Sequence, residues 1–135
     1  MARRFVIVFV TAALFWMTPA AASPDPNLRS VSAQRHHVVA VFALGDLAPG
    51  EIVVSSNART TRSGAFLARD VKLREWMRPQ IEASGLARWA TRHTLPAGTY
   101  YVQVSGIVTQ IDCKPGLHPC LEDWSNVRRL AVPRF

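Results

Sequence analysis

Several features that would mark an enzyme are missing from this 135-residue chain. It contains no nucleophile elbow, no P-loop and no dinucleotide-binding fingerprint, which are the usual local motifs of hydrolases, nucleotide-binding proteins and dehydrogenases. Its four histidines lie in three separate regions, and no local spacing pairs one with a nucleophile and an orienting acid. The sequence therefore predicts no catalytic residues, no metal site and no cofactor.

Long apolar runs are also scarce, and the main one stands at the N-terminus. Arg3 and Arg4 precede an apolar stretch of about 13 residues, short of the roughly 20 that a membrane-spanning helix needs. Small residues at 20–22 follow, as at a cleavage site. The pattern predicts a signal peptide at residues 1–22, membrane contact only before its cleavage, and a secreted, extracellular product. A retained membrane anchor is the alternative.

Cysteine is limited to Cys113 and Cys120, which flank the segment KPGLHP. In an exported protein a close, even pair of cysteines is typical of a disulfide bond, which for a loop this short contributes about 2.5 kcal/mol. A metal site that also used His118 would need a fourth ligand from elsewhere and reduced cysteines. The disulfide is the favoured interpretation.

Acidic residues and lysine are few beside arginine. The chain has 16 basic and 9 acidic residues, a formal net charge of +7, and only two of its basic residues are lysine. Loss of Arg3 and Arg4 with the signal peptide lowers that charge to +5. Such a balance favours weak, salt-sensitive attraction to anionic polymers of the cell envelope, without specific recognition of nucleic acid.

The remaining chain reads as one domain, with a leader and an edge strand at 23–34 and the domain proper at 35–135. Apolar, β-branched runs at 36–44 and 51–57 flank the compact turn GDLAPG and predict a first pair of strands. The sequence further predicts a strand at 69–75, followed by irregular chain or a short helical turn, and later strands that bury Trp89, Tyr100, Val102 and Val104. About seven short strands and no secure helix predict an all-β, antiparallel sandwich.

The segment LPAGTYYVQV, followed later by DWSNVRRLAVP, resembles the fibronectin type III and immunoglobulin-like modules of secreted bacterial proteins. The resemblance implies a structural corner made by Leu95, Gly98 and Tyr100, in which the tyrosine ring enters the core and its hydroxyl bonds to backbone upstream. Tyr100 is preferred to Tyr101 because it shares a strand face with two valines. The tryptophan expected in the second strand is absent, and VVAVFAL stands in its place.

The resemblance implies a non-catalytic binding module whose partner is an unknown protein or a cell-envelope polymer. Loops on a rigid scaffold usually carry recognition. Trp76 is set among charged residues and is the tryptophan expected to be exposed. His36 and His37 are expected to be solvated edge residues. Two other functions stay open: an extracellular enzyme or enzyme inhibitor that presents a disulfide-fixed loop, and an electrostatic binder of anionic envelope polymer. The candidate contact residues are Asp46, Leu47, Trp76, Lys114, Leu117 and His118.

Overall fold

The computed structural model describes residues 26–45, 47–108 and 122–134. Within this part of the chain, regular structure is almost entirely β-strand, and the exception is a 3-10 turn, η1 (Ala68–Asp70). The strands are β1 (Asn27–Gln34), β2 (His37–Ala43), β3 (Leu47–Ser55), β4 (Val71–Trp76), β5 (Gln80–Ile81), β6 (Ala87–Thr94), β7 (Gly98–Val108), β8 (Glu122–Trp124) and β9 (Arg128–Val132).

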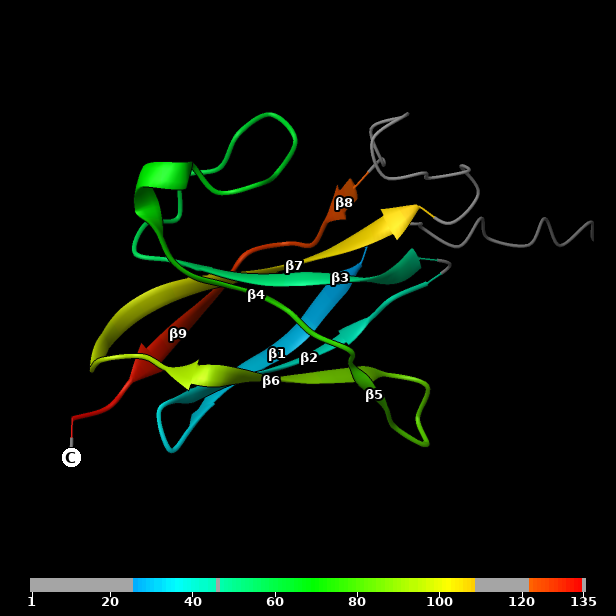
Figure 1. Cartoon of the computed structure of the whole chain (residues 1–135), viewed down its shortest axis with the longest axis horizontal. Coiled ribbons are helices and arrows are strands. Elements are labelled where there is room, and N and C mark those ends of the chain that lie inside the picture. Colours follow the sequence, from blue (N-terminus) through cyan, green and yellow to red (C-terminus); the bar gives the residue numbers. More distant parts are fainter. Residues whose placement is uncertain (1–25, 46, 109–121, 135) are drawn as a thin grey trace, which may run out of the picture.

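The strands form two antiparallel sheets that pack face to face (Figure 1). The first sheet has the order β1-β2-β6-β5, and β1 is the edge strand that the sequence predicts near residue 28. The second has the order β4-β3-β7-β8, and β9 pairs with the same strand, β7, as β8 does. The predicted antiparallel sandwich is confirmed, and its arrangement is compatible with an immunoglobulin-like fold.

The sequence analysis predicted that the two apolar runs around GDLAPG pair with each other, and this prediction is wrong. β2 pairs with β1 and β6, whereas β3 pairs with β4 and β7, so the connection crosses from one sheet to the other. Both strands are buried because they face a shared core from opposite layers. The hairpin partner of β2 is β1, joined to it through Arg35 and His36.

The middle of the chain contains the predicted strand, with slightly different ends, since residues 69–75 become η1 and β4. The loop between β3 and β4 folds over the outer face of the second sheet, where Phe66 is buried together with Val53 and Gln103. Thr60 forms an isolated bridge with Phe66, which closes the loop on itself. The extra length of the middle segment therefore builds a small second apolar layer.

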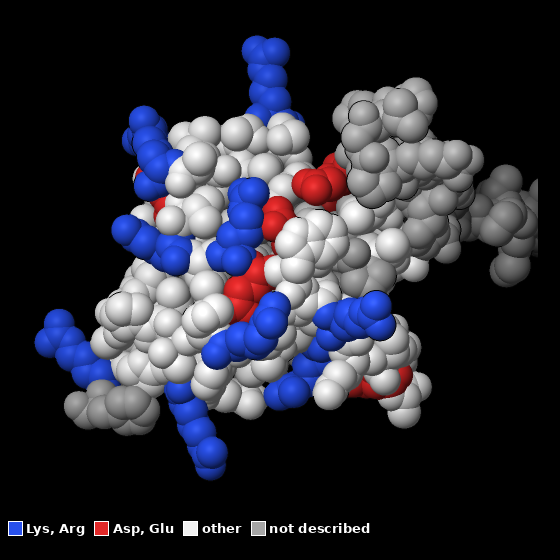
Figure 2. All heavy atoms as spheres, in the orientation of Figure 1, with Lys and Arg blue, Asp and Glu red and all other residues white. Residues whose placement is uncertain are grey.

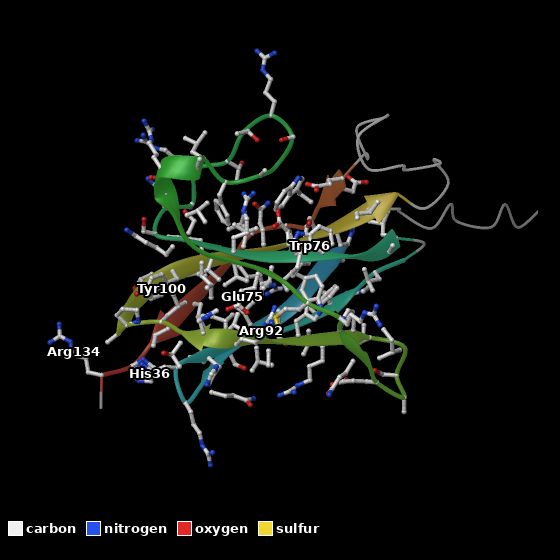
Figure 3. The ribbon with its side chains drawn as sticks, in the orientation of Figure 1. His36, Glu75, Trp76, Arg92, Tyr100 and Arg134 are labelled. Atoms are coloured by element: carbon white, nitrogen blue, oxygen red, sulfur yellow. The ribbon has the colours of Figure 1, made fainter. Side chains whose placement is uncertain are left out.

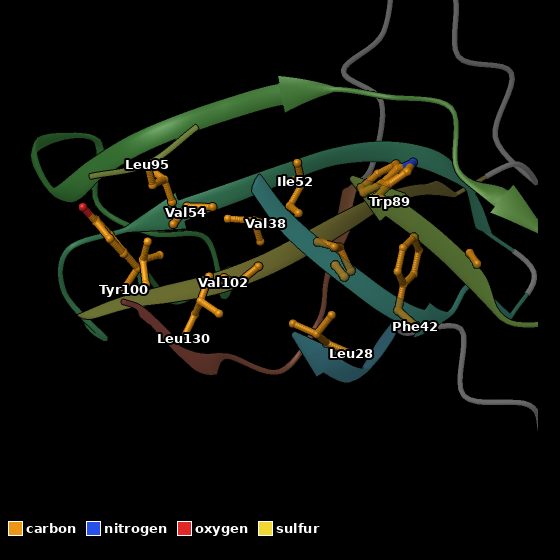
Figure 4. Packing of buried hydrophobic residues seen from close by; sticks show 14 residues of the cluster. Leu28, Val38, Phe42, Ile52, Val54, Trp89, Leu95, Tyr100, Val102 and Leu130 are labelled. Atoms are coloured by element: carbon orange, nitrogen blue, oxygen red, sulfur yellow. The ribbon is translucent and has the colours of Figure 1, made fainter. Parts of the chain in front are cut away.

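The main core lies between the sheets and contains Trp89, Tyr100, Val102 and Val104, as the alternation predicted (Figure 4). The indole of Trp89 packs against Phe42, with ring centroids 5.0 Å apart and an interplanar angle of 54°. A tryptophan on β6 and a phenylalanine on β2 thus form an aromatic pair in the core.

The corner at LPAGTY has the predicted geometry. The hydroxyl of Tyr100 donates a hydrogen bond of 2.9 Å to the carbonyl oxygen of Pro96, and Leu95 is buried beside the ring. Gly98 has φ +157°, a backbone angle that residues with a Cβ rarely adopt. The segment quoted for the resemblance is therefore structural, since it fixes the start of β7 against the core.

A second structural device is the sequence Trp-Ser-Asn between β8 and β9. The hydroxyl of Ser125 accepts the N–H of Val104 at 3.0 Å where the strand pairing is interrupted. Asn126 reaches the other sheet: its Oδ1 accepts the N–H of Leu28 at 2.8 Å, and its Nδ2 donates to the carbonyl of Leu28 at 3.1 Å. Arg128 donates to the same carbonyl at 2.8 Å. These bonds close the edge of the sandwich between β1 and β9.

Candidate binding surface

Most of the predicted loop contacts fall outside the described residues. Asp46, Lys114, Leu117 and His118 lie there, as do Cys113 and Cys120 and the disulfide expected between them. Leu47, predicted as part of a possible binding loop, is described, and only 6% of its surface is accessible. The reason is that β3 begins at Leu47, four residues before the predicted start, so this part of GDLAPG is strand and turns the leucine inward.

The predicted contact residues, apart from Trp76, come from two connections, the one after β2 that contains GDLAPG and the one after β7 that contains CKPGLHPC. The strands that flank these two connections end at the same end of the sandwich. Leu47 pairs with Val108, and Ile107 pairs with Glu122, so the ends of β3, β7 and β8 are adjacent. A cleft of about 400 Å³ opens at this end of the described structure. It is lined by Pro26, Asn27, Arg29, Ala43, Gly45, Trp124 and Asn126.

Trp76 is exposed, as predicted, with 54% of its surface accessible. It ends β4 on the outward face of the second sheet and lies opposite Glu51 on β3 (Figure 3). The guanidinium of Arg92, on β6 of the other sheet, donates to the carbonyl oxygen of Trp76 at 3.3 Å. Trp76 thus stands where the two sheets approach at an open edge, with its backbone tied to both.

Beside Trp76, the buried carboxylate of Glu75 ties β4 to β6. It accepts the backbone N–H of Arg92 at 2.7 Å and that of His93 at 2.9 Å, and it bonds Nδ1 of His93 at 2.5 Å. Burial acts to raise the pKa of Glu75, but the hydrogen bonds from Arg92 and His93 outweigh it, so the pKa is lowered. The ionised carboxylate is therefore the stable form at neutral pH.

The sequence analysis did not single out Glu75, although a signal was present. In VKLREW the apolar residues Val71 and Leu73 alternate with Lys72 and Arg74, and the next pair reverses this pattern. A charged residue at a core-facing position, followed by an aromatic at a solvent-facing one, indicates a buried ionic contact and an exposed ring.

Glu51 is also buried, but its environment is less favourable to the ionised form. Burial raises its pKa, the Arg74 guanidinium 3.6 Å away lowers it, and the nearby carboxylate of Glu122 raises it again, with a net rise. Glu51 thus lies beside both Arg74 and Trp76 on the outward face of β3 and β4.

The histidines are more involved in packing than the sequence analysis expected. Nδ1 of His37 bonds the carbonyl of Thr91 at 2.8 Å, and Nδ1 of His36 bonds that of Leu95 at 3.0 Å. Both are only partly exposed, so their interpretation as solvated edge residues is wrong. The fold brings them beside the end of β6, because His37 pairs with Thr94.

An enzyme would be favoured by a histidine buried with an acid and a serine. The His93 ring meets the acid Glu75, but 76% of its side chain is accessible. In the described ranges, no cluster of three or more His, Cys, Asp and Glu residues could hold a metal ion. A search of the same ranges found no helix of the length and apolarity that membrane crossing requires.

Charge is unevenly distributed between the two sheets. Figure 2 shows a short band of acidic side chains bordered on both sides by lysine and arginine. Most of the described acidic residues belong to the second sheet: its strands carry Glu51, Glu75, Glu122 and Asp123, and Asp70 lies in η1 just before β4. Among the described acids, Glu82 alone belongs to the first sheet, where it follows β5. The first sheet therefore has few carboxylates to neutralise its arginines.

These features define the protein as an antiparallel β-sandwich, compatible with an immunoglobulin-like fold, in which Glu75 and Asn126 join the two sheets. A scan against protein-family models and a search of curated proteins find no match to the chain.

Proposed function

We propose that this protein is an exported, non-catalytic binding module of the fibronectin type III kind, and that its contact surface centres on Trp76. The N-terminal sequence supports export, because a basic start, a short apolar run and small residues have the order of a signal peptide. The Tyr100 corner and the entry to the last strand through Trp-Ser-Asn support the fibronectin type III assignment.

The observation that carries the proposal is the exposed indole of Trp76 on a rigid edge. Large aromatic side chains are normally placed in the core of a small sandwich, as Trp89 is, and an exposed tryptophan is a typical anchor at interfaces. Glu75, the residue before Trp76, is bonded to β6, so the backbone that carries the indole is held in place before any partner binds. Such preorganisation lowers the entropic cost of binding.

The absence of catalysis is supported by how the acid and base groups are used. Glu75 accepts three hydrogen bonds from β6, and Glu51 is buried next to Arg74. His36 and His37 bond backbone carbonyls. These contacts give the two carboxylates, and Nδ1 of each histidine, a role in holding strands together.

The proposal is tested by nuclear magnetic resonance of the indole N–H groups. A neutral glucan oligosaccharide and a peptidoglycan fragment are titrated separately, and Trp76→Phe assigns the signal. We expect at least one ligand to shift the Trp76 signal saturably, to leave the Trp89 signal in place, and to be recovered uncleaved.

Three other results of this titration would contradict the proposed function. Shortened oligosaccharide in the recovered ligand would identify an enzyme. A shift confined to Trp124 would move the contact surface to the cleft that Trp124 lines. No response to any ligand would refute an envelope polymer as the partner of this surface.

A further inference from the structure

A groove of about 580 Å³ lies on the outward face of the first sheet, away from Trp76. Its floor is formed by Val39 and Ala90, which pair across β2 and β6. Val39 faces outward yet is only 4% accessible, because longer side chains stand around it. The groove is lined by Gln34, Arg35, His37, Val39, Arg88, Ala90 and Thr91.

The lining of this groove is cationic and carries no carboxylate among the described residues. Arg35 and Arg88 contribute guanidinium groups, and Arg88 donates a hydrogen bond of 3.3 Å to the side-chain oxygen of Gln34 across the groove. A neutral amide orients the guanidinium without cancelling its charge. The remaining donors of both arginines are therefore available to an anionic ligand.

The rim of the groove is held in an unfavourable backbone conformation. Arg35 has φ +49° and His36 has φ +67°, both in the left-handed region that two-residue hairpin turns normally fill with asparagine and glycine. His36 secures the turn, because its carbonyl accepts the N–H of Leu95 at 3.0 Å and its ring bonds the carbonyl of Leu95. Strained residues that a fold holds in place are concentrated at ligand sites, and here the strain fixes Arg35 at the rim.

The shape and chemistry of the groove select among anionic partners. Its lining contains no tryptophan, tyrosine or phenylalanine, so it lacks the stacking platform of a site for single-stranded nucleic acid. It lies on the face of a sheet and not at an edge, so an acidic peptide could not add to it as a strand. Guanidinium groups bind carboxylates in pairs of parallel hydrogen bonds, and the amide of Gln34 suits hydroxyl groups.

We propose that the groove over β1, β2 and β6 binds a segment of an acidic, carboxylate-bearing polysaccharide through Arg35 and Arg88. The ligand lies across Val39 and Ala90 with its carboxylates on the two guanidinium groups. This site is separate from the Trp76 surface and goes beyond the function proposed for it.

The test is a calorimetric titration of the full purified protein with an oligogalacturonate at about 50 mM salt, repeated at about 200 mM. Arg35→Asn removes the charge but keeps a residue that tolerates the left-handed turn. We expect Arg35→Asn combined with Arg88→Gln to weaken binding by about a hundredfold, about tenfold for each charge-assisted contact. The control Arg59→Gln removes one charge from the β3–β4 loop, as each single groove variant does, and should change affinity less than about twofold.

Three results would overturn the proposal. An equal loss in Arg59→Gln and in either groove variant would mean diffuse attraction by net charge. Tighter binding of an oligothymidylate of equal charge would identify a nucleic-acid site. No binding of oligogalacturonate by the unmodified protein would exclude the ligand class. Trp76→Ala is predicted to leave this titration unchanged, so failure here and failure of the Trp76 surface are distinguishable.

Discussion

Replacement of Glu75 tests the contact that joins the two sheets at the edge beside Trp76. The bulge in β6 explains why this contact exists: the pairing of β2 with β6 shifts between His37 and Val39, and the hydroxyl of Thr91 accepts the N–H of Val38 at 2.9 Å. Glu75, from the other sheet, accepts the amides of the two residues that follow Thr91. Glu75→Ala would leave both amides without this partner.

The expected loss follows from those two bonds. A hydrogen bond to a charged group contributes about 1.5–3 kcal/mol, so the two amide bonds account for about 3 kcal/mol at the lower end of that range. The His93 ring adds little because its side chain is 76% accessible and water replaces the contact. We expect Glu75→Ala to lower the free energy of unfolding by about 3 kcal/mol at pH 7, and Glu75→Gln by less, because its amide oxygen still accepts one bond.

The pH dependence has a definite sign. A carboxyl group whose pKa in the folded protein lies below its ordinary value of 4.5 stabilises the fold when ionised. That contribution is complete above pH 4.5 and is lost as the pH falls through the lowered pKa. The difference in stability between the wild type and Glu75→Ala should therefore be constant from pH 7 to pH 5 and shrink below pH 4.5.

Urea denaturation followed by tryptophan fluorescence measures this difference at each pH. Glu82→Gln is the matched control, because Glu82 is an exposed carboxylate in the turn after β5. It should change the free energy of unfolding by less than about 0.5 kcal/mol at any pH. A gap between wild type and Glu75→Ala that persists unchanged to pH 3 would refute the role assigned to the carboxylate charge.

Three further substitutions test the other polar contacts. Tyr100→Phe removes the bond to Pro96 and should cost about 1 kcal/mol in urea denaturation without changing the near-ultraviolet signature of the core. Asn126→Ala leaves the buried backbone of Leu28 without two bonds and should cost about 2–4 kcal/mol, with faster hydrogen exchange along β1 in mass spectrometry. Glu51→Gln should stabilise the protein at pH 7, because the pKa of Glu51 is raised in the fold, and thermal melts should show that gain disappearing below pH 4.5.

The strands and the corner were predictable because local signals determine them. Alternation from Tyr100 to Val104 orients β7, and the resemblance to fibronectin type III modules implied the bond that the hydroxyl of Tyr100 makes. Trp76 was recognised as exposed because charged residues surround it in sequence. These features depend on neighbours along the chain and not on the packing of distant strands.

The pairing of strands was less predictable. A compact turn such as GDLAPG can close a hairpin or carry the chain to the other sheet, and its residues satisfy both geometries. The groove on the first sheet depends on Arg35 and Arg88, which are 53 positions apart in sequence and meet only through the pairing of β1, β2 and β6. No local pattern encodes that meeting.

The buried polar residues mark the places where the strand ladders are irregular. Thr91 stands at the bulge in β6, Ser125 at the break between β8 and β9, and Ser105 beside the shift in β3, where its hydroxyl accepts the N–H of Glu51 at 3.2 Å. In each case a side-chain oxygen accepts an amide at a position where the regular ladder is interrupted, because a buried amide cannot be left unpaired at low cost. Beside two of these breaks, at Arg92 and His93 after Thr91 and at Asn126 after Ser125, the sandwich joins its two sheets.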